Sequence, residues 1–220
     1  MEEILKNLNI EYKNITLYEQ AFIHTSYAYE QNLNSYETLE FLGDAIVDLI
    51  ISDYLYKSGL YTEGEMTKIR ASYVCENALY EYATELDLGK YIKVGIGEKR
   101  ADGNHKKAIM ADVFEAFMGA IYLDLGYEKV KEVGLSIIVP YIEDKDIMLF
   151  KDYKSTLQEA VQTDKKSLEY ELLEESGPAH NKTFKMCVKV DGIILGEGVG
   201  ASKKEAEQEA AKNALSILSK

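Results

Sequence analysis

Two segments of the sequence place carboxylates at helical spacing within runs of apolar residues. In the first segment, Glu37, Glu40 and Asp44 precede the apolar residues 45–47 and 49–51. At about 100° of rotation per residue, Glu40 and Asp44 lie within about 40° of each other on a helix, with Glu37 beside them. Moving ionised carboxylates into a buried helix face is costly unless a partner compensates the charge. The spacing therefore indicates a helix that holds a cation.

The second segment carries Asp112 and Glu115, three residues apart in the otherwise apolar residues 108–123. Residues three apart share one face of a helix. Two such helices can pack side by side with their acids facing each other, which would bring together Glu40, Asp44, Asp112 and Glu115. Oxygen ligands without nearby histidine or cysteine select a hard cation, so we expect Mg²⁺, with Mn²⁺ able to substitute.

Three further polar residues have a structural as well as a functional interpretation. Glu63 follows Thr62, which with Glu65 fits a capping box, and a carboxylate in this first turn also favours the helix dipole. Asp48 lies one turn after the first group of acids, but an axial step of about 6 Å favours a supporting or surface position over a fourth ligand. A lone histidine beside apolar residues, such as His24, is usually a structural group.

The elements expected around these acids are helices. Apolar spacing predicts helices within residues 1–33, an acidic helix from about 36 to 57, and further helices within 62–86 and 107–141. Gly59 is expected to end the acidic helix, with Lys57 in its last turn. Residues 95–104 contain several glycines and are expected to form a loop.

Charge divides the chain of 220 residues near residue 150. Residues 1–150 hold 14 Lys and Arg against 26 Asp and Glu, whereas residues 151–220 hold 11 and 12. The total of −13 argues against a simple basic nucleic-acid binder. An acidic first part repels phosphate unless divalent cations neutralise its surface, although most of this charge is ordinary solvated surface.

The pattern of apolar residues changes from helical to strand-like spacing in the last part of the chain. A short helix over residues 154–162 is followed by strand-like segments at 167–175, 183–190 and 193–200, with Asp191-Gly192 as a hairpin turn. Ser202 is expected to cap an alanine-rich last helix. Lys203 and Lys204 stand in its first turn, where the backbone attracts phosphate, although two lysines there are usually ordinary surface.

The two cysteines and the apolar runs bear on the compartment. Cys75 and Cys187 have no Cys-x-x-Cys spacing, which indicates free thiols in a reducing environment and no zinc site. No apolar run approaches the roughly 20 residues that a membrane span needs. The acidic N-terminal residues Met1-Glu2-Glu3 lack the layout of a signal peptide. We expect a cytoplasmic protein without a membrane partner.

Motifs in both parts of the chain resemble the ribonuclease III family. Residues 37–45, Glu-Thr-Leu-Glu-Phe-Leu-Gly-Asp-Ala, resemble the family signature, and Glu63-Gly64 and residues 111–116 match its other acidic positions in order. Residues 157–159, 177–180, 196–198 and 202–208 resemble a double-stranded-RNA-binding domain. The family usually has a basic residue where this chain has Thr38, so a supporting ion pair is expected to be absent, with an effect on substrate contact or metal affinity more than on chemistry.

The resemblance implies a fold class and a role for each candidate residue. The fold class is α+β in two domains: an all-α endonuclease domain over residues 1–144, a linker over 145–151, and an α-β-β-β-α double-stranded-RNA-binding domain over 152–220. The implied catalytic, metal-binding acids are Glu40, Asp44, Asp112 and Glu115. Glu37 and Glu63 would seat the RNA strand, and Phe41 would lie at the interface of a homodimer. The implied RNA contacts of the tail are Ser155, Gln158, Gln162, His180, Lys203 and Lys204.

The implied activity is Mg²⁺-dependent hydrolysis of double-stranded RNA to 5′-phosphate and 3′-hydroxyl ends, in ribosomal and other RNA processing. An alternative is a non-cleaving double-stranded-RNA-binding protein on the same fold, which is expected to have lost one or more acids, whereas this chain has lost none. A metal-dependent phosphohydrolase of another helical class is disfavoured because no His-Asp pair accompanies the three histidines His24, His105 and His180.

Overall fold

The computed structural model describes residues 1–143, 153–162, 167–178 and 182–218. The chain divides into two compact units, Met1–Phe150 and Lys151–Lys220. The linker expected over residues 145–151 lies outside the described residues, and the exact domain boundaries stay a prediction.

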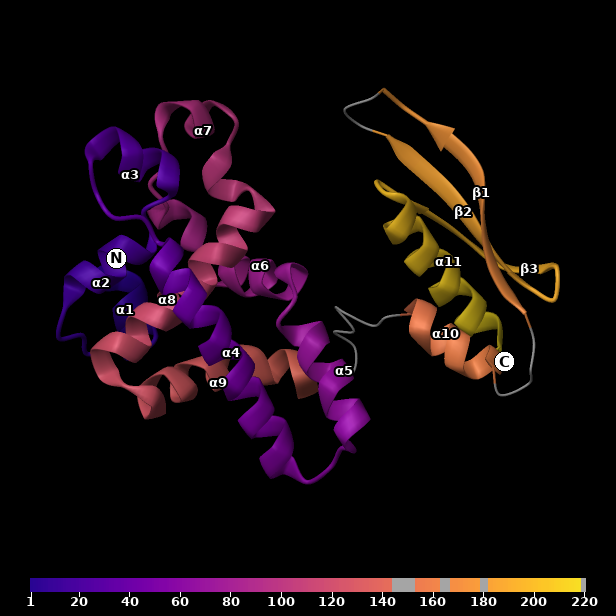
Figure 1. Cartoon of the computed structure of the whole chain (residues 1–220), viewed down its shortest axis with the longest axis horizontal. Helices are drawn as coiled ribbons and strands as arrows, with labels where there is room; N and C mark the ends of the chain where they lie inside the picture. The colour runs from indigo at the N-terminus through magenta and orange to yellow at the C-terminus, as the bar shows by residue number, and fades with distance from the viewer. Residues whose placement is uncertain (144–152, 163–166, 179–181, 219–220) are drawn as a thin grey trace. The chain divides into compact units, whose positions relative to one another are not determined.

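The first unit is built from helices (Figure 1). They are α1 (Glu2–Asn7), α2 (Ile15–Ala21), α3 (Thr25–Gln31), α4 (Glu37–Ser58), α5 (Glu63–Tyr73), α6 (Glu76–Glu85), α7 (Ile96–Arg100), α8 (Lys107–Leu125) and α9 (Tyr127–Glu143), with 3₁₀ turns at Leu88–Tyr91 and Gly103–His105. The predicted helical character of this part is confirmed. Within the described ranges, each helix is too short or too polar to cross a bilayer.

Local signals fix the ends of the acidic helix and of its successor. Gly59 follows α4 in the left-handed conformation, at φ 65°, which glycine adopts without strain. The capping box before α5 is present: the Glu65 backbone N–H donates to Thr62 Oγ1, and the Glu65 carboxylate accepts from the Thr62 backbone N–H. Both features were predicted from the sequence.

The loop predicted over residues 95–104 is wrong in part, because the structure forms α7 within it. Tertiary contacts stabilise this short helix. The Ile96 backbone N–H donates to Glu30 Oε1 at 2.9 Å, and Lys106 pairs with Glu98 at 2.6 Å. Glu30 comes from a remote segment, and Lys106 from the turn that follows α7, so glycine content alone misled the prediction.

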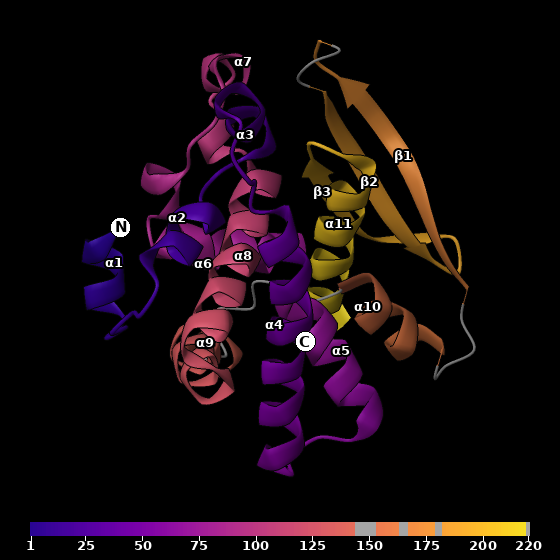
Figure 2. The same cartoon turned by 60° about the vertical axis from the view of Figure 1, so that its left-hand side comes forward.

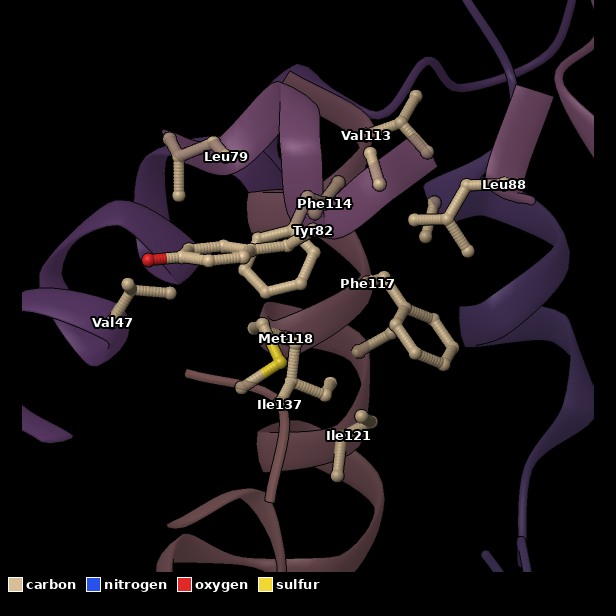
Figure 3. Packing of buried hydrophobic residues seen from close by; sticks show 14 of the residues in the cluster. Val47, Leu79, Tyr82, Leu88, Val113, Phe114, Phe117, Met118, Ile121 and Ile137 are labelled. Carbon is tan, nitrogen blue, oxygen red and sulfur yellow. The ribbon is translucent and has the colours of Figure 1, made fainter. Parts of the chain in front are cut away.

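The apolar core of this unit surrounds α8. Phe114, Phe117 and Met118 of this helix are completely buried. Figure 3 shows them packed with Tyr82 of α6 and Ile137 of α9. Burial of such side chains is the main favourable term in folding, so α8 is the central scaffold on which the other helices of this unit are placed.

The second unit has the predicted order α-β-β-β-α. Its elements are α10 (Tyr153–Gln162), β1 (Leu168–Ser176), β2 (Thr183–Val190), β3 (Ile193–Gly200) and α11 (Lys203–Leu218). The strands form one antiparallel sheet in the order β1-β2-β3, and the turn Asp191-Gly192 has positive φ at both residues, as a type I′ hairpin requires. Helices α10 and α11 pack on one face of the sheet (Figure 1), around Leu157, Val188 and Ala210.

Candidate active site

The two helices that carry the acids, α4 and α8, cross in direct backbone contact. They contact each other more extensively than any other pair of elements in the first unit, and both views show them side by side (Figures 1 and 2). A Cβ atom added at Gly43 of α4 would lie 1.8 Å from the carbonyl oxygen of Glu115, and one added at Gly119 of α8 would lie 2.4 Å from that of Leu39. The two glycines therefore allow an approach that no other residue type permits.

This crossing places the four predicted acids on adjacent turns of two neighbouring helices. Gly43 stands directly before Asp44, and its Cα approaches the backbone of Glu115 itself. Glu40, Asp112 and Glu115 are half-buried, whereas Asp44 is exposed. The acids of α4 and α8 thus share one region at the edge of the core.

The electrostatics of Glu115 and Glu40 show that both face other acids. Burial, followed by the nearby carboxylates of Asp44 and Glu40, raises the pKa of Glu115 to about 8. Burial likewise raises the pKa of Glu40 to about 7, with Asp112 as the next largest cause. Carboxylates that hold a proton near neutral pH lack a compensating positive charge, which is the condition that a bound cation relieves.

The third half-buried acid, Asp112, has a specific hydrogen-bond donor. The phenol of Tyr36 donates to Asp112 Oδ2 at 3.0 Å. Burial raises the pKa of Asp112, and this hydrogen bond opposes the rise. Tyr36 could not be predicted as a site residue, since a tyrosine directly before a helix gives no signal of a partner on another helix.

The oxygen atoms of the four acids are the ligand type that a hard cation prefers, although the acids do not enclose an ion in this structure. Among the described residues, no three carboxylate, imidazole or thiol groups are close enough together to enclose an ion. Four carboxylate side chains at a backbone crossing, three of them with a raised pKa, match the oxygen ligands that Mg²⁺ prefers.

Of the other candidates of the first unit, Glu37, Phe41 and Asp48 lie on α4, whereas Glu63 lies on α5 beside residues 49–56 of α4, beyond the four acids. Glu37 and Phe41 are exposed on α4, and the side chain of Phe41 is 83% exposed. Asp48 is half-buried and adds to the raised pKa of Glu115, so it borders the four acids. Glu63 is exposed and lines a groove of about 410 Å³ between α4 and α5.

His24 has the structural role that the sequence favoured. It is the N-cap of α3, and its Nδ1 accepts from the Ser26 backbone N–H at 3.2 Å. Its ring also lies beside the ring of Tyr36, with 5.8 Å between the centroids.

The RNA-contact candidates of the second unit are described only in part. Gln158 is half-buried on α10, and Lys203 and Lys204 are exposed in the first turn of α11. Ser155 and Gln162 belong to α10, but their side chains, like residue His180, lie outside what the structure describes.

Comparison with known protein families assigns both units. A family model described as Ribonuclease-III-like matches residues 14–142, and one described as Double-stranded RNA binding motif matches residues 153–218. The chain belongs to the ribonuclease III family. The predicted family and fold class are thereby confirmed.

Curated relatives in the ribonuclease III family resemble the chain over its whole length. The protein named Ribonuclease 3 from Onion yellows phytoplasma (strain OY-M) is 48% identical, over 100% of this chain and 92% of the relative. Ribonuclease 3 from Listeria monocytogenes serovar 1/2a is 46% identical, over 99% of this chain and 97% of the relative.

Solved structures of the ribonuclease III family also match. A nuclease domain of ribonuclease III from Campylobacter jejuni is 35% identical with a TM-score of 0.59, covering 63% of this chain and 96% of that domain. It is described as having structural flexibility in a region involved in dimer formation.

Proposed function

We propose that this endoribonuclease of the ribonuclease III family hydrolyses phosphodiester bonds of double-stranded RNA with Mg²⁺, leaving 5′-phosphate and 3′-hydroxyl ends. The family is metal-dependent. The observation that carries the proposal is the α4–α8 crossing, which gathers four acids without a compensating cation in a chain that also contains a double-stranded-RNA-binding motif. Ribosomal and other RNA precursors are the proposed substrates. The free thiols of Cys75 and Cys187 support a cytoplasmic location.

The four acids have the proposed role of holding the metal. When bound, Mg²⁺ supplies Lewis-acid activation of water and stabilises the charge that develops on the phosphate. Glu40 and Asp44 of α4 and Asp112 and Glu115 of α8 would hold it, two acids from each helix. Asp48, one turn beyond Asp44, adds negative charge behind Glu115. Glu37 and Glu63, both exposed, are proposed to seat the RNA strand.

The second unit has the proposed role of recognising the shape of the duplex. A-form RNA offers a wide, shallow minor groove with 2′-hydroxyls, and its phosphates lie across the intervening major groove. Lys203 and Lys204 at the start of α11 suit the phosphates, because backbone N–H groups and the helix dipole act in the same direction. Gln158, with Ser155 and Gln162 on the same helix and His180 before β2, completes the proposed contact set.

One substitution tests the proposed nuclease against the alternative, which is a protein that binds RNA without cutting it. Glu115→Gln keeps the shape of the side chain but removes its charge. We expect cleavage of labelled duplex RNA in Mg²⁺ to fall at least about 100-fold, because a stabilising group in the site is lost, while the Kd for the duplex changes little.

Glu19→Gln is the matched control, since it makes the same change at an exposed position of α2. Normal cleavage by the Glu115 variant would contradict the assignment of the acids. Wild-type protein that binds duplex RNA but does not cut it with Mg²⁺ or Mn²⁺ would favour the alternative.

Phe41 supports the proposal of a homodimer. Its side chain is 83% exposed one residue after Glu40 and, unlike that of an exposed tyrosine, has no polar group for water to solvate. We expect Phe41→Ala to shift the protein toward the monomer in sedimentation velocity at micromolar concentration.

Tyr29→Ala on α3 is the control for the dimer test, because Tyr29 is 91% exposed and has no proposed role. A Phe41 variant with the sedimentation coefficient of the wild type would remove Phe41 from the interface.

A further inference from the structure

The hydrogen bond between Tyr36 and Asp112 joins the two halves of the acid cluster. Tyr36 directly precedes α4, and its phenol reaches Asp112 on α8 with an O···O distance of 3.0 Å. A phenol donates to an ionised carboxylate, so the bond favours the charged form that can ligate a metal. The bond uses Oδ2, and the carboxylate keeps Oδ1 for a second interaction.

The donor is itself held firmly in place. Only 3% of Tyr36 is exposed. Its backbone N–H donates to the Ile23 carbonyl at 2.9 Å, and its own carbonyl accepts from the N–H groups of Leu39 at 2.8 Å and Glu40 at 2.9 Å. The ring lies beside His24. A residue fixed at backbone and ring has little rotational freedom to lose when it orients a partner.

We propose that Tyr36 is a positioning residue for the metal site, which holds the carboxylate of Asp112 in its ligating orientation before the cation arrives. The inference rests on the proposed metal-dependent function. Hydrogen-bond partners of metal-ligating side chains typically change metal affinity 10–100-fold when they are removed. Tyr36 would orient a ligand on another helix, because its backbone lies at the start of α4 and its hydroxyl donates to Asp112 on α8.

A purely structural role is the competing explanation, and the same domain contains a bond of that kind. Tyr18 is completely buried, and its phenol donates to Asp124 Oδ2 at 3.0 Å. Asp124 also accepts from the backbone N–H groups of Lys13 and Asn14, so it ties the N-terminal segment to the end of α8. At 1.5 Å per residue, it lies roughly 13 Å along α8 from Glu115. Tyr18→Phe therefore removes an equivalent bond outside the acid cluster.

The test compares wild type, Tyr36→Phe, Tyr18→Phe, Asp112→Asn and the double variant Tyr36→Phe with Asp112→Asn, all in the full-length protein. Calorimetric titration with Mg²⁺ in the absence of RNA measures metal affinity, and urea denaturation in EDTA measures stability. We expect Tyr36→Phe to raise the Kd for Mg²⁺ about tenfold or more, and Tyr18→Phe to leave it unchanged. Cleavage by Tyr36→Phe should recover toward the wild-type maximum at high Mg²⁺. In an Asp112→Asn background, Tyr36→Phe should have no further effect on metal affinity.

The outcomes separate this inference from the proposed function. Wild type that binds no Mg²⁺ would overturn both. Wild type that binds Mg²⁺, with a Tyr36→Phe variant of equal affinity, would overturn the positioning role alone. An equal loss of affinity in Tyr18→Phe would also overturn it, because the loss would then follow from stability and not from the contact with Asp112.

Discussion

Glu115 is an acid whose charge the fold disfavours. It is half-buried at the α4–α8 crossing, and the neighbours that shift its pKa are all acids. The pKa of Glu40 is raised for the same reasons, by a smaller amount. Asp53, on the same helix as Glu40, shows the opposite case, because Lys131 and Lys57 lower its pKa. The acids of the cluster differ from ordinary acids of the same helix in lacking such partners.

The raised pKa values of Glu115 and Glu40 predict that the metal-free protein loses stability as pH rises. The folded state binds more protons than the unfolded state between the ordinary carboxylate pKa of 4.5 and the folded values of about 7 and about 8. Stability therefore falls as pH rises through this window and levels off above it. Urea denaturation at several pH values in EDTA measures the effect.

The matched control for the pH prediction is the double variant Glu40→Gln and Glu115→Gln, which should lose less stability across the same window. Saturating Mg²⁺ should also flatten the wild-type curve, because it stabilises the ionised acids. Parallel curves for wild type and the double variant would contradict the assigned pKa shifts.

At the scale of the element, the α4–α8 pair determines where the acids lie. Gly43 of α4 and Gly119 of α8 each face the backbone of the other helix, so main-chain contact fixes the distance between the two helices. Large side chains elsewhere on α8, such as Phe114 and Phe117, fill the core behind the crossing. Packing density of this kind leaves no room to absorb an added atom.

We expect Gly43→Ala to destabilise the protein by about 3 kcal/mol or more, at the upper end for overpacked sites. Its methyl group would stand 1.8 Å from the carbonyl oxygen of Glu115, and a backbone atom cannot rotate away. Chemical denaturation measures the change. Gly64→Ala in α5 is the control, since nothing lies within 4 Å of its added Cβ, and it should stabilise by roughly 0.5–1 kcal/mol through helix propensity. Equal stability of the two variants would contradict the close crossing.

The sequence predicted the elements better than their contacts. Acid spacing identified α4 and α8, and turn residues located the ends near Gly59 and the hairpin at Asp191-Gly192, because these signals are local. The helix α7 and the Tyr36–Asp112 bond were not predicted. Both depend on which distant segments meet, and neither hydrophobic period nor turn propensity contains that information.

At the scale of the whole molecule, the two units differ in charge, which fits a catalytic first unit and a second unit that contributes affinity for RNA. Most of the negative charge belongs to residues 1–150, whereas residues 151–220 are nearly neutral. Several lysines of the second unit pair with acids of the same unit, such as Lys185 with Glu197 at 2.7 Å. The first unit alone would repel RNA in the absence of divalent cations.

Deletion of residues 151–220 is therefore expected to weaken duplex RNA binding at least about tenfold at physiological salt, while cleavage persists at low salt. Electrophoretic mobility shift and cleavage assays in the same buffers measure the two effects. Circular dichroism of the truncated protein controls for folding. Unchanged affinity for duplex RNA after truncation would remove the second unit from substrate binding.

The backbone crossing of α4 and α8 also has a consequence for protein synthesis. Gly43 and Glu115 are far apart in the sequence, so a nascent chain that has exposed only α4 carries half of the acid cluster. Domains generally fold as units once their elements have emerged, and the site can assemble only after α8 has left the ribosome. A chain interrupted before that point would lack nuclease activity while it is still held by the ribosome.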